Sequence, residues 1–166
     1  MDFSEAKEQF ISTWGELGCS WGICRTMGQI HALLLISPTP VCADQIKEEL
    51  DISGGNANMN LRALVDWGIV YRRSIPGERK DYYVAEKDFW SVFKKVLLKR
   101  KKQELNPMIE LTRNLSDTKV SCEQSREFIR VIDNINVIST AADKSLDKLL
   151  SCESNLLLNT VVRVMR

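Results

Sequence analysis

The chain has 166 residues, 44% of them hydrophobic and 27% charged, which fits one globular domain or a small domain with a helical extension. No stretch approaches 18 consecutive apolar residues, and the acidic start Met1–Glu5 does not resemble a secretory signal. We therefore expect a cytoplasmic protein without a membrane segment. The formal net charge is only +1, yet residues 62–102 hold 12 Lys/Arg against 5 Asp/Glu, which indicates a local anionic partner or a solvated basic face.

The 5 cysteines and the single histidine match no zinc or disulfide spacing, so we expect neither a metal nor another cofactor. Buried or half-buried thiols are the main expectation, and a redox-sensing role of Cys19 or Cys24 is the alternative. An enzyme would need a nucleophile with a base, a metal cluster or paired carboxylates in a cleft. The sequence indicates none of these, and we expect no enzyme.

Apolar spacing and turn signals predict an order of helices and strands that places a helix-turn-helix before a β-hairpin. Ser53 is a suitable N-cap and Gly68 a suitable C-terminal residue for the second helix of that motif, and Asp88 caps the helix after the hairpin. Pro107 interrupts, bends or restarts that helix. In chain order the predicted helices are 3–17, 25–36, 43–50, 54–67, 88–104, 121–150 and 156–165, with strands at 69–73 and 81–85.

The helix predicted at 54–67 opens with small and hydrogen-bonding residues, where an ordinary surface helix would carry Glu, Lys and Ala. Glycines let a backbone approach phosphates, asparagine side chains pair with adenine edges, and arginine pairs with guanine or phosphate. The alternative is a polar capping region with surface asparagines. The candidate DNA-binding residues of this helix are Ser53, Gly54, Gly55, Asn56, Asn58, Met59 and Arg62.

The predicted hairpin carries four cations around one turn, namely Arg72, Arg73, Arg79 and Lys80. Such a basic wing can reach the minor groove or the DNA backbone beside the recognition helix. Its alternative role is to guard the edge of a sheet against unwanted pairing. The hairpin and the helix together favour DNA binding.

The sequence resembles the MarR-type winged-helix regulators, and within them the GbsR-like branch. The motifs that carry the resemblance span roughly residues 10–105: Trp21-Gly22, Arg25-Thr26, Gly28, Leu34-Leu35-Ile36-Ser37-Pro38, Ala43-Asp44-Gln45-Ile46, the run from Ser53 to Leu64, Trp67-Gly68-Ile69-Val70, the run from Pro76 to Tyr83, and Glu86-Lys87-Asp88-Phe89-Trp90. The resemblance implies a homodimer on a pseudo-palindromic operator of double-stranded DNA, usually as a repressor.

The expected fold is mainly α with a small β-hairpin wing, a winged helix-turn-helix domain plus long dimerisation helices. We expect supporting helices at 1–36, the DNA-binding domain at 37–87 and a helical dimerisation region at 88–166. The apolar stripe of the helix at 121–150 exceeds what a small domain needs for its own core, which favours a dimer over an intramolecular three-helix bundle.

The resemblance also implies a small-molecule effector, because GbsR-like relatives are linked to choline and glycine betaine. Quaternary amines bind aromatic cages. Trp14, Trp21, Trp90 and Phe93 are the candidates for such a cage, although aromatic residues at helical spacing are more often core. A winged domain that docks protein instead of DNA is the alternative function.

Overall fold

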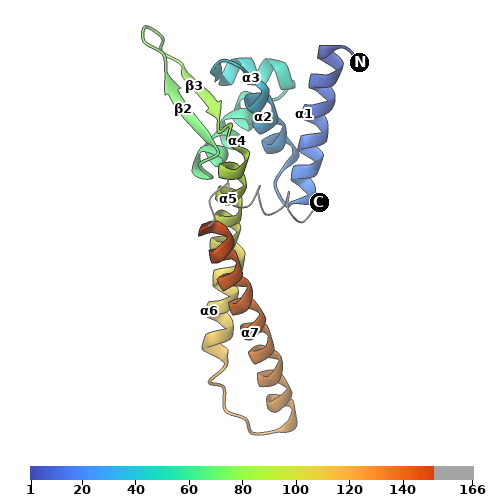
Figure 1. The fold of residues 1–166 in the computed structure, drawn as a ribbon, viewed down its shortest axis with the longest axis vertical. Helices are drawn as coiled ribbons and strands as arrows, with labels where there is room; N and C mark the ends of the chain where they lie inside the picture. Colours follow the sequence, from blue (N-terminus) through green and yellow to red (C-terminus); the bar gives the residue numbers. More distant parts are fainter. Residues whose placement is uncertain (152–166) are drawn as a thin grey trace, which may run out of the picture. The chain divides into compact units, whose positions relative to one another are not determined.

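The computed structural model describes residues 1–151, so the helix predicted at 156–165 lies outside the described residues. The described chain forms two compact units, Met1–Lys95 and the described part of Val96–Arg166. The expected fold, mainly helical with a small antiparallel sheet, is confirmed (Figure 1). Its elements are α1 (Phe3–Ser20), α2 (Arg25–Ile36), β1 (Val41–Cys42), α3 (Ala43–Leu50), α4 (Gly54–Asp66), β2 (Val70–Ser74), β3 (Asp81–Ala85), α5 (Phe89–Arg100), the π-helical turn η1 (Lys101–Leu105), α6 (Asn106–Leu115) and α7 (Glu123–Ser151).

Helices α1 and α2 cross closely because glycines meet at the crossing. A Cβ atom added at Gly28 would lie 3.0 Å from the Cα of Gly15 and 3.1 Å from the carbonyl oxygen of Trp14. The other side of α2 is the centre of the core, where Ile30 is 0% and Leu34 is 1% exposed. Helix α2 is therefore buried on nearly all sides, which explains its very apolar sequence.

Helices α3 and α4 form the predicted helix-turn-helix. The turn between them needs a left-handed residue, which Asp51 supplies at φ 49°. Ser53 is the N-cap of α4, as predicted, and its hydroxyl accepts a hydrogen bond from the Asn56 backbone N–H at 3.2 Å. At the other end Gly68 takes φ 71°, the left-handed conformation predicted for it. The left-handed Asp51 and the Ser53 N-cap therefore determine where α3 ends and α4 begins.

The sheet has three antiparallel strands in the order β1-β3-β2. Strands β2 and β3 form the predicted wing, with Arg72 opposite Tyr83 and Ser74 opposite Asp81. Strand β1, which pairs Val41 with Tyr83, was not predicted from the sequence. A strand of two residues is too short to show an alternating pattern, and this one follows the segment Pro38-Thr39-Pro40. It forms because β3 has an edge with which it can pair.

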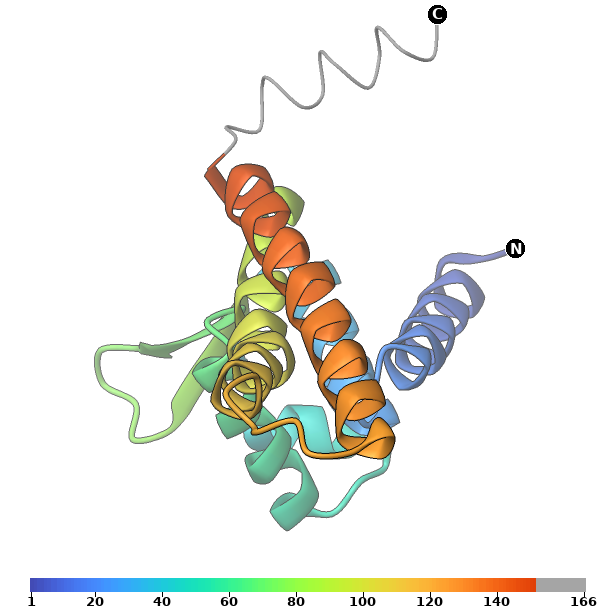
Figure 2. The ribbon, with the colours of Figure 1, turned by 90° about the horizontal axis from the view of Figure 1, so that it is seen from below.

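In the second unit α6 and α7 lie side by side, joined by a loop (Figures 1 and 2). The helix predicted at 88–104 is α5 followed by η1, and Pro107 stands in the first turn of α6, where a proline costs no hydrogen bond. Of the three alternatives left open, Pro107 interrupts the α-helical hydrogen-bonding pattern: the π-helical turn η1 precedes it, while Leu105 and Asn106 keep the αR conformation. Among the described residues, the helices are each too short or too polar to cross a bilayer.

Candidate nucleic-acid interface

The N-terminal half of α4 presents an exposed surface made by most of the residues predicted to bind DNA. Met59 is 62% exposed, and Asn58 and Arg62 are also exposed. Ala57, Leu61 and Leu64 point into the core and hold this surface in place. Helix α4 therefore has one face fixed by burial and one face that makes few contacts with the rest of its own chain.

Gly55 has no visible role inside the chain. A Cβ atom added there would meet nothing within 4 Å, and its backbone is helical rather than left-handed. Glycine in a helix costs roughly 0.5–1 kcal/mol relative to alanine. The neighbouring Gly54 is nearly as open, since its nearest contact is the Lys47 side chain at 4.0 Å. The glycines leave room for a close approach from outside the chain.

The asparagines of α4 differ in how their side chains are used. Asn58 donates from Nδ2 to the carbonyl oxygen of Gly54 at 2.9 Å. Asn60 is only 3% exposed and donates from Nδ2 to the carbonyl oxygen of Asn56 at 2.9 Å and to its Oδ1 at 2.7 Å. The burial of Asn60 was not predicted from the sequence.

Two of the four wing cations are neutralised within the chain. Arg72 pairs with Asp81 across the hairpin at 3.4 Å, and Lys80 pairs with Asp44 of α3 at 2.7 Å. Arg73 and Arg79 are exposed and make no ion pair among residues 1–151. The wing therefore offers two unpaired arginines, while Lys80 ties it to the helix-turn-helix.

A polar cluster at the base of the wing was not predicted. The Tyr71 hydroxyl donates to Glu86 at 2.7 Å, and the Lys95 ammonium lies 3.1 Å from the same carboxylate. The hydrogen bond from Tyr71, followed by those from the Asp88 backbone and from Lys95, lowers the pKa of Glu86 to about 2. The cluster joins Tyr71 of β2 to Lys95 in the middle of α5, and no periodic signal in the sequence pairs these three positions.

Lys87, next to this cluster, caps the C-terminal end of α2. Its ammonium donates to the carbonyl oxygens of Leu34 and Ser37, each at 2.9 Å, and also to that of Leu35. The positive charge lies at the negative end of the helix dipole, where it is favourable. Lys87 thereby holds the end of the wing against α2.

The four aromatic residues predicted as a cage make the following ring contacts. Trp14 contacts Phe10, His31 and Phe89. Trp90 stacks on Phe93 with 5.3 Å between ring centroids, and Lys94 places its ammonium 5.9 Å from the Trp90 ring. Trp21 is 60% exposed at the end of α1. A cation already lies over one of the four rings, and the aromatic cage stays a prediction.

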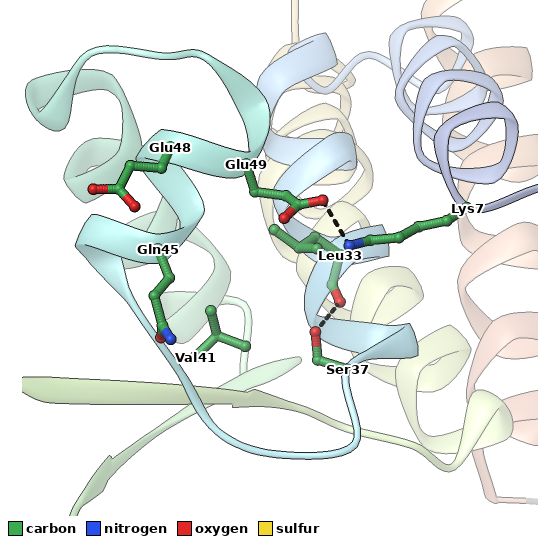
Figure 3. Close-up of a pocket in the computed structure, with 7 residues that line it drawn as sticks. All are labelled: Lys7, Leu33, Ser37, Val41, Gln45, Glu48 and Glu49. Atoms are coloured by element: carbon green, nitrogen blue, oxygen red, sulfur yellow. Dashed lines mark hydrogen bonds and ion pairs between the residues drawn. The ribbon is translucent and has the colours of Figure 1, made fainter. Parts of the chain in front are cut away.

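Figure 3 shows a hollow between α1, α2 and α3 that was not predicted from the sequence. The Lys7 ammonium crosses it to reach Glu49 of α3 at 2.6 Å. Lys7 and Glu49 also line a second hollow together with Arg25 and Gln29. None of the four predicted cage residues lines either hollow. The residues of the hollow in Figure 3 are Lys7, Leu33, Ser37, Val41, Gln45, Glu48 and Glu49.

The expectation of buried or half-buried thiols is wrong for Cys19, Cys24 and Cys122, which are exposed, and right for Cys42. The exposed cysteines lie at or near helix ends, where a residue is covered on fewer sides. Cys24 is the N-cap of α2, and its Sγ accepts from the Met27 backbone N–H at 3.4 Å. Cys152 lies outside the described residues.

No family model matches the chain. Over 89 residues, 54% of the chain, it is 28% identical to the HTH-type transcriptional repressor GbsR of Bacillus subtilis (strain 168), of which the match covers 49%. YvaV of the same strain is 24% identical over 89 residues, which are 54% of this chain and 50% of that protein. The resemblance to GbsR-like regulators is confirmed. The match spans about half the length of these relatives.

A crystal structure described as that of a transcriptional regulator superposes with a TM-score of 0.68, covering 87% of this chain and 95% of the other. The two sequences are only 17% identical. The likeness therefore concerns the fold, and it extends over most of the described chain, including helices beyond the wing.

Proposed function

We propose that the protein is a sequence-specific DNA-binding transcriptional regulator that places α4 in the major groove. The observation that carries the proposal is the open glycine pair at the start of α4, since Gly55 has free space around it and no need for a glycine backbone. A helix N-terminus without side chains lets backbone N–H groups approach a phosphate. The names of the similar proteins, the HTH-type transcriptional repressor GbsR and the putative HTH-type transcriptional regulator YvaV, support a regulator.

The wing supports the same function. Arg73 and Arg79 are the cations left unpaired on the described part of the hairpin. Arginine inserted in a narrow minor groove or set against phosphates is a common second contact beside a recognition helix. We assign Arg73 and Arg79 to direct DNA contact. Arg72 and Lys80 are held in ion pairs with Asp81 and Asp44 in the free protein, so they are less available for such a contact.

We further propose that the protein acts as a homodimer through residues 88–166, with residues 1–36 supporting the DNA-binding domain at 37–87. Polar side chains join α6 to α7: Thr112 Oγ1 lies 3.2 Å from Asn136 Oδ1, and Ser116 donates to Asp133 at 3.0 Å. The apolar side chains Phe128, Val131 and Ile138 instead remain 42%, 43% and 69% exposed. Exposed apolar stripes of this kind are usually buried against another subunit.

A two-fold dimer sets two recognition helices roughly 34 Å apart, one turn of DNA, and so reads a pseudo-palindromic operator. We also propose that the protein represses transcription and that a quaternary amine controls it. The residues proposed to hold this amine are Trp14, Trp21, Trp90 and Phe93. A titration of tryptophan fluorescence with choline and glycine betaine tests the effector. Absence of any response would remove the effector and leave the DNA-binding function unaffected.

The main experiment measures binding to the DNA upstream of the protein's own gene, titrated with salt and with random competitor DNA. We expect saturable binding that survives the competitor and weakens steeply with salt, because phosphate contacts release counterions. Asn58→Ala and Arg79→Ala weaken it by roughly tenfold or more, as expected for a lost base or phosphate contact. Asn134→Ala in α7 and Arg113→Ala in α6 are the matched controls.

The possible outcomes separate the candidate functions. If random DNA competes equally, the search moves to fragments of the whole genome, and an operator found there sustains the proposal. If no duplex binds at low salt, the proposal is wrong, and the winged domain docks protein instead.

A further inference from the structure

Asn60 is a buried amide whose hydrogen bonds connect α2 to the proposed recognition helix. Its Oδ1 lies 3.0 Å from the Sγ of Cys24, the N-cap residue of α2. Its Nδ2 donates both to the carbonyl oxygen and to the side-chain Oδ1 of Asn56, one turn earlier in α4. A side chain that is 3% exposed needs such partners, because an unsatisfied buried amide is costly.

The backbone carbonyl of Asn56 fixes the orientation of the whole chain of bonds. A carbonyl oxygen only accepts, so the Asn60 atom 2.9 Å from it must be the amide nitrogen. The Asn60 oxygen then faces Cys24, whose thiol must donate its hydrogen. The second amide hydrogen of Asn60 goes to the Asn56 side chain, which must turn its oxygen inward to accept it.

Asn56 therefore has its own amide nitrogen left for an external partner, and that nitrogen only donates. Asn58 is in the opposite situation. Its Nδ2 donates one hydrogen to the carbonyl oxygen of Gly54, and its Oδ1 has no partner within residues 1–151. Two neighbouring amides of α4 thus present different hydrogen-bonding groups: donors at Asn56, and an acceptor with one remaining donor at Asn58.

We propose that Asn60 is a specificity-determining residue that acts by positioning Asn56. With its oxygen held inward, Asn56 reads guanine, whose major-groove edge carries only acceptors. Asn58 keeps both groups that a bidentate contact with adenine needs. This refines the sequence-based expectation, which assigned adenine to both residues. The inference rests on the proposed function, since it requires α4 to lie in the major groove.

The test is selection of bound duplexes from a random library, using the full chain and its variants. Asn56→Asp keeps the oxygen that accepts from Asn60 and replaces the outward donors by an acceptor. We expect its preference at one base position to change from guanine to cytosine, which offers a donor there. Asn60→Leu keeps the size of the side chain and frees Asn56, so discrimination at that same position falls from roughly tenfold to near onefold.

Asn58→Ala is the matched control, because it alters a different base position and leaves the one read by Asn56 unchanged. Circular dichroism and thermal melting verify that each variant is folded. If Asn60→Leu does not fold, Asn56→Asp decides alone, and an unchanged guanine preference in that variant overturns the inference.

The wild-type selection separates this inference from the proposed function. A wild-type protein that selects no motif overturns both. A wild-type protein that selects a motif, together with a folded Asn60→Leu variant that selects the same motif with equal discrimination at every position, overturns only the role of Asn60.

Discussion

Lys80 in the wing and Asp44 in α3 are joined by an ion pair, with 2.7 Å between Nζ and Oδ2. The hydrogen bond from Lys80, reinforced by its charge, lowers the pKa of Asp44. Both side chains are 59% exposed, so the pair adds little to stability. Its consequence is geometric, because a cation predicted from the sequence to bind DNA is held by Asp44, an acid of the helix that precedes the recognition helix.

Asp44→Asn is expected to strengthen DNA binding. Loss of the acid frees Lys80 and removes a negative charge beside α4, so one more phosphate contact becomes available per subunit. The slope of log affinity against log salt concentration then steepens by about 1 per subunit. A gel-shift or fluorescence-anisotropy titration at several salt concentrations measures it, with Glu110→Gln in α6 as the control. An unchanged slope would show that Lys80 lies away from the DNA.

Gly55→Ala should affect stability and binding in opposite directions. The added methyl group meets nothing within 4 Å in the free protein, so the helix gains roughly 0.5–1 kcal/mol of stability. The same methyl group blocks a close approach of DNA, and the affinity should fall roughly tenfold or more. Chemical denaturation and DNA titration give the two values. Ser145→Ala, an exposed helical position in α7, should stabilise the protein without changing the affinity.

Cys24→Ser and Cys24→Ala should differ. A serine hydroxyl still accepts from the Met27 N–H and donates to Asn60, whereas alanine does neither. The alanine variant should lose about 1–2 kcal/mol of unfolding free energy and part of its guanine discrimination, and serine should lose neither. Denaturant titration and duplex selection measure the effects. Equal behaviour of the two variants would remove Cys24 from the hydrogen-bonded chain.

His31 predicts how stability depends on pH. Burial, with a smaller contribution from the Lys87 charge, lowers the pKa of His31 from 6.5 to about 4. Between these values the unfolded chain binds a proton that the folded chain does not, so the unfolding free energy falls as the pH decreases. From pH 7 to 4.5 the loss is about 2–3 kcal/mol.

His31→Gln is the matched variant for this pH dependence, because a glutamine oxygen can still accept from the Trp14 indole that now donates to His31 Nδ1 at 3.3 Å. Denaturation curves give the unfolding free energy at each pH. Between pH 7 and pH 4.5 this free energy should fall by about 2–3 kcal/mol less in the variant than in the wild type. Parallel curves for the two proteins would contradict the assignment. Glu86 does not interfere strongly, because its pKa of about 2 confines most of its contribution to lower pH.

Ile138→Asp should convert the proposed homodimer to a monomer. The side chain is 69% exposed in the single chain, so a charge there leaves the subunit folded and is costly only when a second subunit covers it. Analytical ultracentrifugation gives the mass, and circular dichroism reports the fold. Lys144→Glu, on another side of α7, should leave the mass unchanged. A dimer that persists in Ile138→Asp would place the interface elsewhere.

Local rules predicted most of the fold. The bounds of α2, α3 and β3 agree with the prediction to the residue, because prolines, a cap or a turn mark their ends. Strand β1 and helix α6 were not predicted. The first forms only by pairing with β3, and the second contains Pro107 in its first turn, a residue that in a sequence usually marks the end of a helix. Which side chains face outward on α4 also followed from spacing, with the exception of the buried Asn60.

The side-chain contacts between elements could not be predicted from the sequence. Lys80 with Asp44, Tyr71 with Glu86, and Asn60 with Cys24 join positions 15 to 36 residues apart. Each pair needs the tertiary fold to bring its members together, and no single-chain periodicity encodes it. The exposure of Cys24 was mispredicted because a preference for burial says nothing about a thiol at the end of a helix.

The three hydrogen bonds of Lys87 also bear on the end of α2. The carbonyl oxygens in the last turn of an α-helix have no partner inside the helix. One ammonium satisfies those of Leu34 and Leu35 together with that of the following Ser37. A side chain that follows the second strand of the wing therefore completes the end of a core helix, so the core and the attachment of the wing depend on each other for their stability.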